Sequence, residues 1–313
     1  MSQNHTMMQF FEWHILPDGT HWKRLKELAS ELKDKGIDSV WIPPPTKAQT
    51  PEDTGYGIYD LYDLGEFDQN GSIRTKYGTK DELIEAIEAC KENDICVYAD
   101  VVMNHKAGAD ETERFKVIEV DQNNRMKEIS GPFDIDGWTK FTFPGRGDTY
   151  SSFKWNVEHF NGTDYDEGTV RTGIFKILGD HKGWNDNVDL EFGNYDYLMF
   201  ANIDYNHPVV REEMIKWGKW LTETLQCDGY RLDAVKHIDY TFIRDFALEM
   251  HQTHGDHFYM FGEYWNPDLK ACQEYLQKVE FTVDLIDVPL HFKLHHASQA
   301  GRDFDLRTIF DDT

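Results

Sequence analysis

Basic and acidic residues gather at the end of one apolar stretch of the sequence. The segment GYRLDAVKHI, residues 229–238, contains Arg231, Asp233, Lys236 and His237. If it begins as a strand, alternation directs Arg231 and Asp233 to the same face of the sheet. A guanidinium beside a carboxylate stabilises the charged form of the carboxylate and fixes its orientation. The pattern therefore predicts a carboxylate nucleophile that is ionised at neutral pH.

A second carboxylate ends another apolar run. Glu263 closes residues 258–263 and is followed by Tyr264 and Trp265. A carboxyl group against aromatic surface favours its neutral form, which a general acid requires. Two carboxyl groups in different environments indicate divided acid and base roles. Retaining glycosidases hold such a pair about 5–5.5 Å apart, a separation that adjacent strand ends can supply.

A third polar strand end precedes these two in the sequence. Residues 100–105, DVVMNH, begin with Asp100 and end with Asn104 and His105. In a parallel α/β barrel, functional residues lie at the C-terminal ends of the strands. The structural alternative is a buried Arg–Asp pair that only stabilises the core, with the glutamate on a solvent-exposed rim. Three polar ends in successive units favour a functional site.

The elements that position these residues alternate between strands and helices. We expect strands at residues 9–12, 39–42, 95–103, 229–232, 258–263 and 280–285, and helices at 21–35, 80–91, 209–224, 241–253, 268–278 and, weakly, 303–310. Such alternation predicts a parallel sheet with right-handed crossovers. The pattern gives about six strand–helix units.

The middle of the chain breaks this alternation. Residues 104–207 are rich in Gly, Asp, Asn and aromatic residues and show little helical periodicity. A structureless loop of that length is implausible in a compact domain. We therefore expect an irregular β-rich subdomain, 104–207, inserted after the third strand of a barrel domain that comprises residues 1–103 and 208–313.

Composition limits the partners and the location. The 313 residues include 32 Lys and Arg and 57 Asp and Glu, a formal net charge of −25. Such a surface repels nucleic acids and anionic membranes, so we expect neither as a partner. The N-terminus lacks the features of a secretory signal peptide, and the four cysteines have no CxxC spacing. These observations predict a cytoplasmic protein with reduced thiols and no membrane span.

Several segments resemble one known family. DVVMNH (100–105), GYRLDAVKHI (229–238) and GEYW (262–265) closely resemble the first three conserved regions of the α-amylase family, glycoside hydrolase family 13. QFFEWHILPDGTHWKRL, WIPPPTKA, GYGIYDLYDLGEF and GNYDYLMFANIDYNHP are similar to liquefying and intracellular bacterial members, and the likeness covers nearly the whole chain. The resemblance implies a (β/α)8 TIM barrel and retaining endo-hydrolysis of α-1,4-linked glucans such as starch, glycogen and maltodextrins.

The resemblance also implies the roles of individual residues. Asp233 matches the nucleophile, Glu263 the general acid/base and Arg231 the residue that positions the nucleophile. Matched to substrate-binding positions are Tyr56, His105, Lys236, His237, Trp13 and Asp100. The alternatives that remain are a core aromatic for Tyr56, core packing for His105 and a solvated surface lysine for Lys236.

A calcium ion is implied at the junction between the inserted subdomain and the barrel. The matching ligands are Asn104, Asp196, Asn202 and the backbone carbonyl of His237. Asn202 and Asn161 stand where relatives carry aspartate, while Asp204 keeps one position of an additional metal cluster. Because each Asn removes a negative charge, we expect one calcium site of weakened affinity and little support for the cluster. The alternative is that these are ordinary turn residues.

One family feature has no counterpart in the sequence. The fourth conserved region, resembling FVDNHD, is missing, and the chain ends at IFDDT. We therefore expect an incomplete barrel without the family's C-terminal β-domain, with unpaired edge strands, poor stability and little activity of its own. The alternative functions are another family-13 enzyme, a transglycosylase or an α-1,6-acting enzyme, and an inactive glycan-binding remnant.

Overall fold

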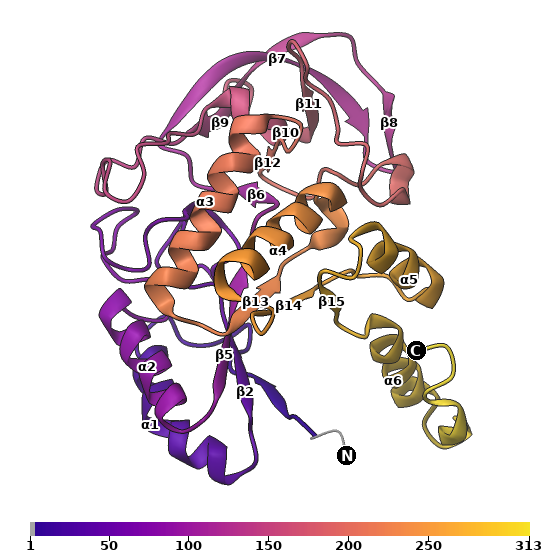
Figure 1. Ribbon diagram of the computed structural model, residues 1–313. Coiled ribbons are helices and arrows are strands. Elements are labelled where there is room, and N and C mark those ends of the chain that lie inside the picture. The colour runs from indigo at the N-terminus through magenta and orange to yellow at the C-terminus, as the bar shows by residue number, and fades with distance from the viewer. Residues whose placement is uncertain (1–3) are drawn as a thin grey trace.

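A computed structural model describes residues 4–313, and its central element is an open, entirely parallel sheet (Figure 1). The strands, in their spatial order, are β1 (Met7–Gln9), β2 (Ser39–Ile42), β5 (Cys96–Val101), β13 (Gly229–Leu232), β14 (Tyr259–Gly262) and β15 (Asp284–Leu285). Each strand pairs in parallel with the next. This order confirms the predicted barrel-type α/β fold with six strand–helix units.

A helix follows each of these strands before the next barrel strand begins. The helices are α1 (His21–Asp34), α2 (Lys80–Glu92), α3 (Pro208–Leu225), α4 (Tyr240–His254), α5 (Leu269–Lys278) and α6 (Val288–Ala300). Helix α1 buries Trp22, Leu25, Ala29 and Leu32, a spacing that places one apolar stripe against the sheet. Helix α2 starts with a capping box formed by Thr79.

The central strand β13 requires glycine at its first position. A Cβ atom on Gly229 would lie 1.8 Å from the carbonyl oxygen of Tyr259 on β14. Only glycine permits this approach, which sets the register that pairs Arg231 with Asp100 on β5 and with Phe261 on β14. The polar strand ends are therefore brought together by the packing of β13 against both neighbours.

A second, antiparallel sheet lies between β5 and α3 in the sequence and occupies the upper part of Figure 1. Its strands are β6 (His105–Lys106), β12 (Ala201–Ile203), β10 (Phe160–Asp166), β11 (Arg171–Ile177), β7 (Glu111–Asp121), β8 (Asn124–Glu128) and β9 (Phe133–Lys140). The predicted β-rich insertion after the third barrel strand is thus confirmed, while the domain boundaries stay a prediction. A short hairpin, β3 (Lys47–Ala48) and β4 (Ile58–Asp60), lies beside the insertion in the chain's β2–α2 connection.

Three expectations about elements near the ends of the chain were wrong. The first strand is Met7–Gln9, earlier than expected, and the strand expected at 280–285 is reduced to β15 because Glu280 and Phe281 adopt φ of 55°. The weakly helical segment contains only two single-turn 3-10 helices, η4 (Gly301–Asp303) and η5 (Leu306–Thr308). Helix α6 was not expected, because its apolar residues follow no helical period. Its buried residues are Val288 and Pro289, both at its N-terminus.

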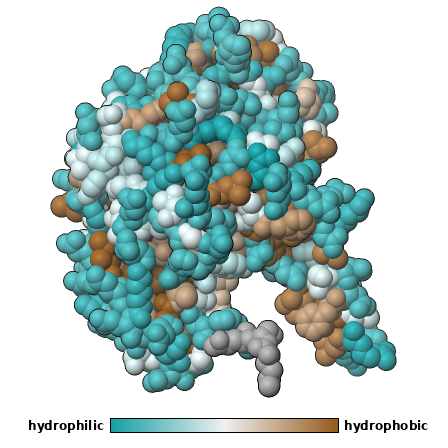
Figure 2. All heavy atoms as spheres, viewed as in Figure 1, coloured by the Kyte–Doolittle hydropathy of each residue, from teal (hydrophilic) through white to brown (hydrophobic). Residues whose placement is uncertain are grey.

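The surface seen in Figure 2 is mostly hydrophilic, with apolar side chains exposed around α6 and the segment that follows it. Leu294 is 55% exposed, and Leu306 and Phe310 are more than 70% exposed. No helix within residues 4–313 combines the length and the apolar character needed to cross a bilayer.

Candidate active site

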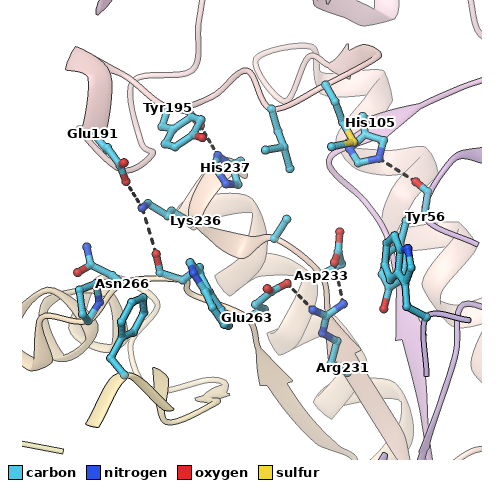
Figure 3. Close-up of a pocket in the computed structure, with 17 residues that line it drawn as sticks. Tyr56, His105, Glu191, Tyr195, Arg231, Asp233, Lys236, His237, Glu263 and Asn266 are labelled. Carbon is cyan, nitrogen blue, oxygen red and sulfur yellow. Dashed lines mark hydrogen bonds and ion pairs between the residues drawn. The ribbon is translucent and has the colours of Figure 1, made fainter. Parts of the chain in front are cut away.

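A cavity of about 650 Å³ opens at the C-terminal ends of β13 and β14. Figure 3 shows Asp233, Glu263 and Arg231 on one side of it, with Glu191, Tyr195 and His105 from the inserted segment opposite. The cavity therefore lies where barrel strands end and the insertion begins, which is the position predicted for functional residues in this fold.

Arg231 joins the two predicted catalytic carboxylates. Its Nη1 donates to Asp233 Oδ1 at 2.7 Å, and its Nη2 donates to Glu263 Oε2. Nη1 also donates to Asp100 Oδ1 and Oδ2, at 2.8 and 3.1 Å. Arg231 is only 4% exposed. The nucleophile and acid/base candidates are thus adjacent, linked through one buried guanidinium.

Asp100, predicted to bind substrate, lies behind the cavity wall and contacts other side chains of the site. Its carboxylate is fully buried and does not line the cavity. In addition to Arg231, it accepts hydrogen bonds from Tyr56 Oη at 2.8 Å and Trp41 Nε1 at 3.0 Å. With its acceptor positions used by protein donors, Asp100 orients Arg231 and Tyr56 and leaves the substrate contacts to them.

The charge on Asp233 depends on more than its contact with Arg231. Burial raises the pKa of Asp233 to about 7; Arg231 lowers this pKa, and the neighbouring Asp100 and Glu263 raise it. We expected the guanidinium to keep Asp233 ionised. Because one guanidinium is shared among three carboxyl groups, it compensates each of them only in part, and the ionised state of Asp233 stays a prediction.

The surroundings of Glu263 also differ from the expected aromatic contact. The ring of Tyr264 packs on Tyr275, 4.6 Å between centroids, and that of Trp265 packs on His291 and Phe292 of α6. Glu263 instead contacts the Arg231 guanidinium, and its side chain is 26% exposed to the cavity. The carboxyl group is therefore open to an incoming ligand on one side.

Lys236 and His237 are turned into the cavity by the backbone that follows β13. Ala234 adopts a left-handed conformation, φ 49°, and begins the 3-10 helix η3 (Val235–His237). Lys236 Nζ donates to Glu191 Oε2 and, at 3.2 Å, to the carbonyl oxygen of Trp265. At 5% exposure, Lys236 is not the solvated surface lysine of the alternative interpretation.

Glu191 is a cavity residue that the sequence did not suggest. It begins the 3-10 helix η2 (Glu191–Gly193), inside the irregular part of the insertion. The same segment contacts η3 twice more: the carbonyl oxygen of Tyr195 lies 2.7 Å from His237 Nδ1, and the amide of Asp189 donates to the carbonyl oxygen of Lys236. No local pattern marks Glu191, since its role follows from this long-range packing.

Aromatic side chains form the opposite end of the cavity. The rings of Trp13 and Tyr56 are stacked, with centroids 5.7 Å apart and an interplanar angle of 14°. Trp13 is 61% exposed, so one face of this pair is accessible. His105 Nε2 lies 2.9 Å from the carbonyl oxygen of Tyr56, and burial lowers the pKa of His105 to about 4, which keeps the ring neutral.

Three of the predicted calcium ligands, Asn104, Asp196 and Asn202, lie in a buried network of amides. Asn104 Nδ2 donates to Asn202 Oδ1 at 3.4 Å, and Asn202 Nδ2 donates to Asn161 Oδ1 at 2.8 Å. Asn161 Nδ2 in turn donates to Asp196 Oδ2 at 2.7 Å. Asn185 donates to both carboxylate oxygens of Asp196, through its backbone and its side chain. Four asparagines therefore surround one aspartate.

This network retains features that suit one hard cation. Asp196 is 1% exposed, and in residues 4–313 no Lys or Arg forms an ion pair with it. Asn185 Oδ1 is buried without a hydrogen-bond donor. A buried, uncompensated carboxylate next to an unpaired amide oxygen fits an oxygen-liganded ion. The described residues contain no cluster of three or more His, Cys, Asp or Glu, so the other ligands of such an ion, apart from Asp196, would be neutral.

Asp204, the position predicted to belong to an additional metal cluster, is paired with a cationic side chain of the protein itself. Lys182 Nζ lies 2.9 Å from Asp204 Oδ2, and both side chains are almost completely buried. The ammonium group donates to this carboxylate oxygen, so a positive charge from the chain already compensates Asp204. In the described structure Asp204 is an ion-pair partner of Lys182, and its predicted role as a metal ligand stays a prediction.

The chain is similar over almost its whole length to known proteins. The chain is 51% identical to a glucan 1,4-alpha-maltohexaosidase of Bacillus sp. (strain 707), over 99% of this chain and 60% of the relative. It is 45% identical to the cytoplasmic alpha-amylase of Escherichia coli (strain K12), over 99% of this chain and 63% of the relative. The chain thus spans about 60% of the length of these curated relatives.

Solved structures show the same fold. The alpha-amylase of Geobacillus thermoleovorans, complexed with acarbose, superposes with a TM-score of 0.63 at 20% identity, over 98% of this chain and 56% of that one. The protein-family model of the alpha-amylase catalytic domain matches residues 25–311 of this chain. The cavity, the carboxylates linked by Arg231 and this match over nearly the whole chain lead to one conclusion: the protein belongs to the α-amylase family, glycoside hydrolase family 13.

Proposed function

We propose that the protein is an endo-acting α-amylase that hydrolyses α-1,4-glucosidic bonds of starch, glycogen or maltodextrins with retention of configuration. The observation that carries this proposal is the link between Asp233 and Glu263 through one guanidinium at the wall of an open cavity. A retaining glycosidase requires two neighbouring carboxyl groups that flank the scissile bond of the sugar. The names of the relatives support an α-1,4-glucan as the substrate.

The first chemical step uses both carboxyl groups. Glu263, protonated, donates its proton to the glycosidic oxygen while the Asp233 carboxylate attacks the anomeric carbon. The C–O bond to the leaving glucan breaks, and an ester forms between Asp233 and the sugar. Arg231 donates to Asp233 Oδ1 and holds the carboxylate in place, so less reorganisation is needed in the transition state.

The second step releases the sugar. Glu263, now ionised, accepts a proton from water, and the hydroxide oxygen attacks the anomeric carbon of the ester. Asp233 leaves as a carboxylate, so two inversions give net retention. Glu263 can serve in both steps because its partly exposed side chain lines the cavity, where substrate and water can both reach it.

Substrate-binding roles follow from the two ends of the cavity. The accessible face of the Trp13–Tyr56 pair stacks against a glucose ring on the side that becomes bound to Asp233, where His105 also lies. Lys236 and Glu191 lie on the leaving-group side. A neutral glucan is not repelled by the protein's net charge of −25, and the cytoplasmic relative supports a cytoplasmic location.

One calcium ion is the cofactor that we propose. Oxygen atoms of Asn104, Asp196 and Asn202, with the backbone carbonyl of His237, would hold it at the junction of the two sheets. When bound, the ion neutralises Asp196, and its contribution is to stability. It takes no part in the two chemical steps.

A reducing-sugar assay with glycogen tests the proposed activity. The wild-type protein should release reducing ends, and Glu263→Gln should lose at least a hundredfold in rate because the acid is absent. Glu274→Gln, a change on the exposed side of α5, is the matched control and should retain full activity. Equal rates for wild type and Glu263→Gln would contradict the proposal. Transfer products in place of hydrolysis products would favour a transglycosylase.

A further inference from the structure

A largely buried lysine side chain occupies the junction between three segments of the insertion. Lys182 lies between β11 and η2, and its ammonium group donates to the carbonyl oxygens of Glu158 and Phe160, at 2.5 and 2.9 Å. Its third contact is with Asp204 Oδ2 at 2.9 Å. The side chain is 10% exposed and that of Asp204 is 2% exposed. Three oxygen acceptors thus match the three N–H donors of the ammonium group.

The three oxygens belong to segments that are distant in sequence but packed together. Glu158 lies in the 3-10 helix η1 (Val157–His159), Phe160 begins β10, and Asp204 follows β12. The amide of Asp204 donates to the carbonyl oxygen of His159 at 2.9 Å, which holds the carboxylate beside η1. Lys182 therefore connects the β11–η2 segment to both strands at one point.

The chemical character of this site is that of a cation site. Two backbone carbonyls and a carboxylate are the ligand types that a hard metal ion uses. Here the positive charge is supplied by the chain, and all three oxygens are directed at one nitrogen. An exposed lysine ion pair contributes little to stability. This pair is largely buried, so removal of one partner would leave the other as an uncompensated charge.

We propose that the Lys182 ammonium is a built-in cation that takes the place of a metal ion at Asp204, so that this part of the junction holds together without metal. The inference is independent of the catalytic activity. It also separates Asp204 from the amide network around Asp196, where one calcium ion fits.

The direct test is the number of calcium ions bound by the purified wild-type protein, measured by equilibrium dialysis against ⁴⁵Ca²⁺ at millimolar concentration. We expect no more than one ion per chain, because the oxygens at Asp204 are already used. Two or more ions per chain would overturn the proposal. This measurement does not depend on the folding of any variant.

Thermal melting of variants tests the role of the ammonium group itself. In EDTA, Lys182→Met should have a Tm about 5–10 °C below that of the wild type. Calcium should raise the Tm of this variant by more than it raises the Tm of the wild type, because the substitution leaves three oxygen atoms without a cation. The extra response should disappear in the double variant Lys182→Met, Asp204→Asn. Lys176→Met, which removes a more exposed ion pair on β11, is the control and should change neither quantity. Equal calcium responses of wild type and Lys182→Met would refute the substitution of a metal by the lysine.

Discussion

Replacement of Arg231 by methionine should destabilise the protein strongly, and more at high pH than at low pH. The guanidinium contacts Asp100, Asp233 and Glu263, and the Asp100 side chain has no exposure to solvent. Removal of one partner from a buried ion pair costs about 3–5 kcal/mol. Methionine fills a similar volume but donates no hydrogen bond, so we expect a loss at the upper end of that range at pH 8.

The pH dependence follows from the state of the carboxyl groups in the variant. Without the arginine, their pKa values in the folded protein rise further above those of the unfolded chain, because burial already raises the pKa of both Asp100 and Asp233. A carboxyl group whose pKa is higher in the folded protein than in the unfolded chain stabilises the fold at a pH below its pKa in the unfolded chain. This stability is lost as the pH rises through its pKa in the folded protein. The loss caused by the substitution should therefore be smaller at pH 5.5 than at pH 8.

Urea unfolding followed by tryptophan fluorescence measures both quantities. Arg244→Met is the matched control, since Arg244 pairs with Asp245 and Glu280 at a site 30% exposed, and it should cost less than about 1 kcal/mol at either pH. A cost below about 1 kcal/mol for Arg231→Met, or a cost that grows toward acid pH, would refute the role assigned to this guanidinium.

Three further predictions concern binding, metal and acid stability. Trp13→Ala should raise KM for maltooligosaccharides about fivefold with little change in kcat, since a stacking contact worth about 1 kcal/mol is lost; an unchanged KM would exclude Trp13 from the binding site. Calcium should raise the Tm of the wild type by a few degrees, and EDTA should reverse this rise. Asn202→Asp should enlarge the rise caused by calcium, because it adds a negative charge to the site. A wild-type Tm that neither calcium nor EDTA changes would count against a calcium site. Burial lowers the pKa of His21 to about 4 from its ordinary 6.5, so the stability it contributes is complete above pH 6.5 and is lost as pH falls toward 4. His21→Gln should remove roughly 3 kcal/mol of this acid sensitivity, measured as the difference in unfolding free energy between pH 7 and pH 4; identical slopes would show that His21 is not responsible.

Most of the barrel elements were predictable because their residues repeat with a simple period. Helix α1, with its apolar stripe, and strand β13 lie where the pattern placed them. Helix α6 has no such stripe, since it is held at its start by Asp287 and Val288 and leaves most of its surface exposed. A helix without an apolar face leaves no periodic trace in the sequence.

The candidate site was predictable to the extent that it lies at strand ends. Arg231, Asp233 and Glu263 follow short apolar runs, and alternation placed the first two on one face. The supporting position of Asp100 depends on the register of β5 against β13, which local sequence does not contain. Glu191 and Lys182 were missed because both lie in irregular segments, and their partners are distant in the sequence.

Chemical rescue with azide tests the division of labour between Asp233 and Glu263 most directly. With α-maltosyl fluoride, a substrate whose leaving group needs no acid, Glu263→Ala should yield the α-azide, because azide attacks the ester on Asp233. Asp233→Ala should yield the β-azide, because azide then attacks the substrate itself from the vacated side. ¹H NMR of the anomeric proton distinguishes the two products. An α-azide from Asp233→Ala, or a β-azide from Glu263→Ala, would contradict the assignment of nucleophile and acid/base.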